Sequence, residues 1–381
     1  MMLPSYKEQL SQLVAAPSVS SAHPDLDMSN RKVLDLLATW FADLGFKIQY
    51  LDIPGHPNKA NLLATLGQGE GGLVLAGHTD TVPYNAERWH QDPFVLTERD
   101  NRYYGLGATD MKGFFPVIAA AAQTFKAKDF KEPLMVLATA DEESSMCGAR
   151  ALVEMAQPKA RYAVIGEPTN LTPIRAHKGI MMEAIRIQGL AGHSSNPNLG
   201  HNAMEAMNDA INVLMNYRRE LQTRYTNASF DIQVPTLNLG YIHGGDNPNR
   251  ICGHCEMHFD LRPLPGMDLE ELRSQMSVLL TPIAEKYSTP LTFESLFPGV
   301  PAFEQARNSE LVKVVEELSG RASETVAFAT EAPYLQALGM QTLVMGPGSI
   351  DQAHQPNEFI EIAQIDPAVN ILRSLIKRFC L

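Results

Sequence analysis

The feature that most constrains the fold is a series of short, strongly apolar runs that alternate with amphipathic segments. The apolar runs cover residues 61–66, 73–77, 134–140, 162–166 and 342–346. Each has the length of one strand and is apolar throughout, which is typical of strands buried on both faces of a sheet. Apolar residues at helical spacing predict helices over residues 5–15, 30–45, 114–126, 148–156 and 308–319. This alternation indicates an α/β fold, with a mixed, largely parallel sheet flanked by helices.

Residues 178–288 interrupt this pattern. Their order of strand, helix, strand, strand, helix and strand is typical of a two-layer α+β unit. The α/β pattern resumes afterwards, so we expect the small unit to be inserted into the larger one. The predicted domains are a larger domain made of residues 1–177 and 289–381, and an inserted domain made of residues 178–288.

The composition limits the partners and the location that we expect. Among 381 residues, 45% are hydrophobic and the net charge is −12. This acidic balance without a basic stripe argues against nucleic acid or an anionic membrane as a partner. No apolar run approaches the roughly 18 residues of a membrane-spanning helix, and the N-terminus lacks a signal-peptide pattern. Because the chain also has only four cysteines, we expect a cytoplasmic protein.

Histidine and acidic side chains follow the predicted strands at the points where the strands end. They are His78, Asp80, Asp141, Glu142, Glu143, Glu167 and His354, and Asp110 precedes a predicted helix. Ligands of α/β sheets bind outside the carboxyl ends of the strands, so we expect these side chains to share one edge.

Two histidines and several carboxylates on one rim indicate a site for zinc or a similar divalent ion. Each motif alone occurs often by chance, but all of them follow apolar strands. The acidic groups are too many for one ion. A pair of ions roughly 3.5–4 Å apart, bridged by a carboxylate, could hold them and lower the pKa of a shared water.

The motifs also resemble those of a known family. "GHTDTVP", "GLGATDMKG", "ADEES", "GEPT" and the late histidine resemble the dinuclear zinc amidohydrolases of the aminoacylase and carboxypeptidase group. The resemblance covers the whole chain, and it implies that residues 178–288 form a lid and dimerisation domain of a homodimer. It further implies that the substrate is a small N-acetyl amino acid. The stretches "RAHKGIMMEAIRIQGLAGHSS" and "GPGSIDQAHQPNE" favour N2-acetyl-L-ornithine, which gives L-ornithine and acetate in arginine biosynthesis.

The resemblance implies two metal sites. In it, His78 and Glu167 bind one ion, Glu143 and His354 bind the other, and Asp110 bridges the two. The ions are expected to be zinc, and cobalt also suits such ligands. The resemblance also implies a cis peptide bond directly after Asp110.

Further roles follow from the same resemblance. Glu142 is expected to be the general base, and Asp80 is expected to orient the ring of His78. His193 is expected to reach the oxyanion, from its own subunit or from the partner. The residues expected to bind the substrate's carboxylate are Asn249, Arg250 and Arg262, because a guanidinium group matches a carboxylate with two hydrogen bonds.

Three consecutive carboxylates remain to be explained at residues 141–143. On an extended chain neighbouring side chains face opposite ways, which would give Glu142 and Glu143 separate roles. For Asp141 we expect only a structural hydrogen bond to nearby backbone.

Two alternatives stay open. The first is another amidase of the same group, such as a succinyl-diaminopimelate desuccinylase or a dipeptidase. The second is a non-catalytic binding protein on the same fold, which a missing ligand or base would mark. None of the motif residues is missing.

Overall fold

The computed structural model describes residues 3–381, which separate into two compact units. The first unit contains the chain up to Arg175 together with Gln305–Glu324 and Thr330–Leu381. The second unit contains Ala176–Glu304 and Thr325–Ala329. The role of residues 178–288 as a lid or dimerisation domain stays a prediction.

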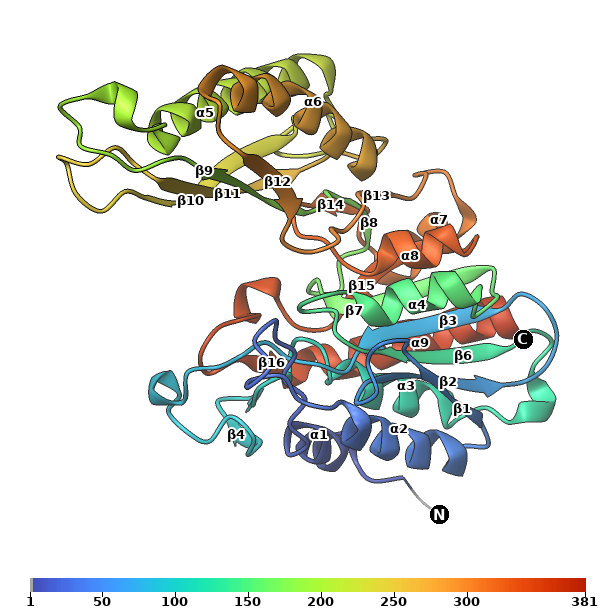
Figure 1. Ribbon diagram of the computed structural model, residues 1–381. Coiled ribbons are helices and arrows are strands. Elements are labelled where there is room, and N and C mark those ends of the chain that lie inside the picture. Colours follow the sequence, from blue (N-terminus) through green and yellow to red (C-terminus); the bar gives the residue numbers. More distant parts are fainter. Residues whose placement is uncertain (1–2) are drawn as a thin grey trace. The chain divides into compact units, whose positions relative to one another are not determined.

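A mixed sheet forms the α/β part of the molecule (Figure 1). Its strands in sheet order are β1 (Lys47–Asp52), β2 (Ala60–Leu66), β6 (Leu134–Thr139), β3 (Leu73–His78), β7 (Tyr162–Pro168), β15 (Gln341–Gly346), β8 (Ile174–His177) and β13 (Phe303–Glu304), with β14 (Glu324–Val326) paired to β8. The chain runs parallel in β6, β3, β7 and β15. β1 and β2 pair antiparallel because their short connection leaves no room for a crossover. The predicted α/β fold with a mixed sheet is confirmed, and its parallel pairing lies at the centre.

Helices cover both faces of this sheet (Figure 1). A large apolar core is shared by α1 (Tyr6–Val14), α2 (Arg31–Asp43), α3 (Phe114–Ala122), α7 (Glu310–Ser319) and α9 (Ile365–Cys380). Alternate residues of β6, namely Leu134, Val136 and Ala138, point into this core. The other face carries α4 (Cys147–Met155) and α8 (Ala332–Ala337), which pack against each other.

The second unit has its own sheet and core. Its antiparallel sheet has the strand order β10 (Thr236–Gly244), β11 (His254–Arg262), β9 (Met181–Gln188) and β12 (Leu291–Ser295). The helices α5 (Ala203–Arg224) and α6 (Leu269–Tyr287) cover one face of it (Figure 1). Residues at helical spacing on both helices, such as Ala206, Ala210, Met276 and Leu280, are buried between helices and sheet. The predicted two-layer α+β unit is thereby confirmed.

A small antiparallel sheet completes the first unit. It consists of β4 (Thr97–Arg99), β5 (Arg102–Tyr104) and β16 (Phe359–Glu361), and β16 pairs with β5. This pairing brings the segment after His354 beside the segment before Asp110. Among the described helices, none has the length and hydropathy of a membrane span.

Candidate metal centre

The central parallel strands end at the residues that the sequence singles out. His78 is the last residue of β3, in register with Thr139 at the end of β6. Glu167 lies near the end of β7, and His354 lies in the loop that follows β15. Because these strands are parallel, their carboxyl ends form one edge, as expected.

Two groups of ligand atoms meet at this edge and share Asp110. In the first, Nε2 of His78 lies 3.1 Å from Oδ1 of Asp110 and 4.0 Å from Oε2 of Glu167. In the second, Nε2 of His354 lies 3.4 Å from Oδ2 of Asp110 and 3.0 Å from Oε2 of Glu143. Each oxygen of Asp110 therefore faces a different histidine. The peptide bond between Asp110 and Met111 is cis, as expected.

The carboxylates of this site are buried close together, which shifts their pKa values. Burial and the charge of Asp110 raise the pKa of Glu143 to about 7. Burial also raises the pKa of Glu167 well above its usual range, although His78 opposes the shift. Burial lowers the pKa of His78, but the carboxylates of Asp110 and Asp80 outweigh it and raise the pKa well above the usual value. These shifts show that several carboxyl groups are crowded together around the histidines.

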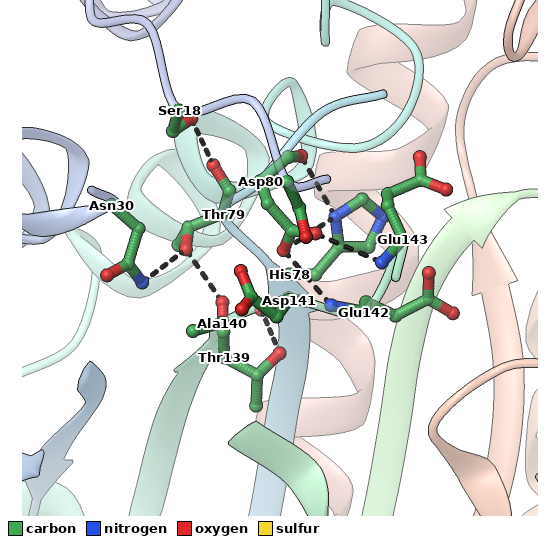
Figure 2. Close-up of polar contacts among 12 residues, drawn as sticks. Ser18, Asn30, His78, Thr79, Asp80, Thr139, Ala140, Asp141, Glu142 and Glu143 are labelled. Carbon is green, nitrogen blue, oxygen red and sulfur yellow. Dashed lines mark hydrogen bonds and ion pairs between the residues drawn. The ribbon is translucent and has the colours of Figure 1, made fainter. Parts of the chain in front are cut away.

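Asp80 connects His78 to the acidic turn (Figure 2). Nδ1 of His78 lies 3.1 Å from the backbone oxygen of Asp80 and 3.6 Å from its carboxylate. The carbonyl of Asp80 is therefore the nearer acceptor for the ring, and the role of its carboxylate in orienting His78 stays a prediction. The carboxylate also accepts hydrogen bonds from the backbone N–H groups of Glu142, at 3.3 Å, and Glu143, at 3.0 Å.

The acidic stretch is a turn, which corrects the expectation of an extended chain. Asp141 has a φ of +56°, and its backbone oxygen accepts hydrogen bonds from Ser145 and Met146. Figure 2 shows the side chain of Asp141 pointing away from those of Glu142 and Glu143. The geometry of the turn separates these side chains, whereas strand alternation was expected to do so.

Asp141 also has a partner that the sequence did not predict. Its carboxylate lies 2.7 Å from Nζ of Lys59, and Nζ also contacts Asp27 at 2.8 Å. We expected a hydrogen bond to nearby backbone, so that prediction is wrong. The cation of Lys59 stabilises a carboxylate that would otherwise be buried without compensation.

Two further buried carboxylates adjoin the site and were missed. Glu358 accepts three backbone N–H groups of the loop that contains Asp110. Glu331 accepts a hydrogen bond from Oγ1 of Thr139 at 2.8 Å, and its charge contributes to the raised pKa of Glu142. Both lie in stretches dominated by other motifs, and a single glutamate carries no pattern that marks its partner.

The remaining predicted residues belong to the second unit. His193 is exposed, and its Nδ1 accepts hydrogen bonds from the backbone N–H of Ser195 at 3.2 Å and from its hydroxyl at 2.7 Å. A backbone bridge links His193 to Arg250, and the guanidinium group of Arg250 is paired with Asp246. The backbone oxygen of Asn249 accepts a hydrogen bond from Ser194.

Arg262 is also engaged in an ion pair. Its Nε lies 3.0 and 2.8 Å from the two carboxylate oxygens of Asp260, on the same strand. The side chains of both arginines are therefore held by carboxylates of their own unit. Their assignment to a substrate carboxylate stays a prediction.

The donor atoms of the site fit divalent metal ions. Ligand atoms of His78, Asp110 and Glu167 lie within 4.8 Å of one another, and so do those of Asp110, Glu143 and His354. Among residues 3–381, the buried Oε1 atom of Glu167 has no hydrogen-bond partner. Imidazole and carboxylate are the ligands that zinc takes, and an ion would satisfy this oxygen. Glu142 also lies within reach of His78 and Glu143, so geometry alone does not separate a ligand from a base.

Comparison with known proteins identifies relatives over the full chain. The family model "Peptidase family M20/M25/M40" matches residues 74–378. Acetylornithine deacetylases from Pectobacterium atrosepticum and from Pectobacterium carotovorum subsp. carotovorum are each 50% identical over 380 residues. Each match covers 100% of this chain and 99% of the relative.

Solved structures of lower identity share the fold. The metallo-carboxypeptidase Sso-CP2 from Sulfolobus solfataricus has a TM-score of 0.76 at 18% identity, covering 98% of this chain and 99% of that one. The Bacillus subtilis YXEP protein, described as a dinuclear metal binding peptidase, has a TM-score of 0.67 at 15% identity, covering 97% and 96%.

Proposed function

The chain belongs to peptidase family M20/M25/M40, and on that premise we propose that it removes the acetyl group from N2-acetyl-L-ornithine. Hydrolysis adds the OH of water to the acetyl carbon and a proton to the leaving nitrogen, giving acetate and L-ornithine. The identity of the acyl group and of the amino acid is inferred from the relatives that are 50% identical over the full chain. Their activity also supports a role in arginine biosynthesis, in the cytoplasm.

One geometric observation carries the metal-dependent part of this proposal. The two oxygens of Asp110 face His78 and His354 separately, so one carboxylate can serve two ions. We propose that Glu167 completes the first set of ligands and Glu143 the second. Zinc is the expected metal and cobalt an alternative. When bound, such ions polarise a carbonyl group and lower the pKa of a water molecule.

Glu142 is proposed as the general base. It takes a proton from the attacking water and passes it to the leaving nitrogen. The carboxylate of Asp80 accepts a hydrogen bond from the backbone N–H of Glu142. This hydrogen bond positions the backbone of Glu142 beside the proposed metal ligands. Burial and the charge of Glu167 raise the pKa of Glu142 well above its usual range, which favours uptake of a proton.

His193 is proposed to stabilise the oxyanion. Because its Nδ1 accepts the N–H of Ser195, the neutral ring carries its proton on Nε2. That N–H is a donor suited to developing negative charge. Asn249, Arg250 and Arg262 are proposed to bind the α-carboxylate. For the arginines, this requires an exchange of their present carboxylate partners, Asp246 and Asp260.

A homodimer formed through the second unit is also proposed. β10 is the outer strand of the antiparallel sheet, and no described strand pairs with its free edge. Tyr241 and Ile242 on this strand are 48% and 56% exposed. A second copy could pair along this edge and cover both side chains. Light scattering should show a dimer, which Ile242→Lys should weaken.

Substrate profiling tests the proposed function. Purified protein loaded with zinc or cobalt is assayed on N2-acetylornithine, N-succinyl-diaminopimelate and a dipeptide. We expect a clear preference for acetylornithine. A preference for the succinylated substrate would identify a desuccinylase. Metal-loaded protein that hydrolyses none of them would indicate a binding protein.

A further inference from the structure

The loop that contains Asp110 is irregular, and its backbone amides need acceptors from outside the loop. Residues 105–112 form consecutive bends and turns that are neither helix nor strand. Gly107 has a φ of +79°, and a Cβ there would lie 2.8 Å from a methyl carbon of Thr81. Such a backbone cannot satisfy its own N–H groups by regular pairing, and buried N–H groups without acceptors are costly.

Glu358 supplies those acceptors. Its Oε1 accepts the N–H groups of Thr109, at 2.7 Å, and Asp110, at 3.0 Å, while Oε2 accepts that of Gly107 at 3.0 Å. The backbone oxygen of Glu358 accepts a fourth N–H, from Gly105. Glu358 is only 2% exposed, so these hydrogen bonds are shielded from water.

The position of Glu358 along the chain adds to this arrangement. It lies four residues after His354, directly before β16, which pairs with β5. One segment therefore supplies the histidine of the second ligand group and the carboxylate that holds the shared Asp110. The hydroxyl of Thr109 also donates a hydrogen bond to the backbone oxygen of Phe359, the residue that follows Glu358.

We propose that Glu358 is a positioning residue that sets the location of Asp110 and thereby controls the affinity of both metal ions. The inference rests on the proposed two-ion site. Because Asp110 belongs to both ligand groups, a displacement of Asp110 weakens the binding of both ions. Loss of His354, by contrast, removes a ligand from the second group only.

Three variants separate this role from general stability. In Glu358→Gln, the new NH₂ group faces at least one backbone N–H, so two donors oppose each other. In Glu358→Ala, all the side-chain acceptors are lost. Glu361→Gln is the matched control, because it removes a carboxylate from the same segment. The carboxylate of Glu361 pairs with Arg102 and has no hydrogen bond to residues 105–112 of the described chain.

In the experiment, the metal-free proteins are titrated with Co²⁺, and binding is monitored by calorimetry and by visible absorption. We expect two equivalents to bind the wild type. In Glu358→Gln both should bind roughly 10–100-fold more weakly, as is usual when partners of ligands are removed. Glu358→Ala should be weaker still, Glu361→Gln should match the wild type, and His354→Ala should weaken one equivalent.

The outcomes separate this inference from the proposed function. Wild-type affinity for both ions in Glu358→Gln would overturn the inference, even if the melting temperature of the metal-free variant fell. Weakening of a single equivalent would also overturn it, because the effect would not pass through Asp110. A wild type that binds two ions but does not hydrolyse acetylornithine would refute the function alone. A wild type that binds no cobalt would refute both.

Discussion

Nζ of Lys59 lies 2.7 Å from the carboxylate of Asp141, and both side chains are almost completely buried. This ion pair connects the residue directly before β2 with the turn that contains Glu142 and Glu143. Burying two charges is costly, and the ion pair offsets that cost only while both partners are present. Asp141 is therefore held by charge in a turn whose backbone geometry few residue types adopt easily.

Removing Lys59 should destabilise the protein strongly. Lys59→Met leaves Asp141 buried without a counter-ion, and we expect a loss of about 3–5 kcal/mol in the free energy of unfolding. Urea unfolding measures this loss. Asp141→Asn should be combined with it, because asparagine tolerates the positive φ. The double variant should lose clearly less than the sum of the single losses, and additive losses would show that the two residues are not coupled.

Glu142 should be needed for turnover and not for metal binding. We expect Glu142→Ala to keep both ions and to lose roughly 10²–10⁴-fold in kcat, the usual contribution of a general base. Elemental analysis and steady-state kinetics check the two parts. Glu143→Ala is the control and should lose metal. If Glu142→Ala loses metal and Glu143→Ala keeps it, the two roles have been exchanged.

His193 should act on the reaction without affecting the metals. We expect His193→Ala to lower kcat by about 10²-fold with unchanged metal content, as for loss of one oxyanion donor. Ser195→Ala is the control, because its backbone N–H still donates to Nδ1 and should preserve the tautomer. It should retain most of the activity. Turnover near the wild-type level in His193→Ala would remove this residue from the mechanism.

His177 should make the protein less stable in mild acid. It is completely buried next to Phe303, and burial lowers its pKa from 6.5 to about 4. In the unfolded chain, the imidazole of His177 therefore becomes protonated near pH 6.5. In the folded protein, it becomes protonated only near pH 4. This contribution to stability is present above pH 6.5 and is lost as the pH falls towards 4.

The measurement compares unfolding at two pH values. Between pH 7 and pH 5, His177 should account for about 2 kcal/mol of lost stability. Denaturant unfolding of His177→Gln should show a pH-dependent loss smaller by that amount. An equal loss in variant and wild type would place the pH dependence in other groups.

The sequence determined the elements of the fold and the residue types at the carboxyl edge of the sheet. Apolar run length and helical spacing are local properties, so β3, β6, β7 and β15 could be predicted, as could α2 and the two-layer unit. His78 and Glu167 directly continue buried strands, so their position at one edge follows from parallel pairing alone.

Tertiary structure decided which side chains became partners. Lys59 and Asp141 are 82 residues apart, and Glu358 and Asp110 are 248 residues apart. No periodicity connects such positions, because burial and hydrogen bonding choose among many possible carboxylate partners only once the chain is folded. The turn at Asp141 arises in the same way, since its left-handed backbone depends on the contacts around it. Nor do the strand ends reveal that the two oxygens of Asp110 face different histidines, because that depends on a loop held by the distant carboxylate of Glu358.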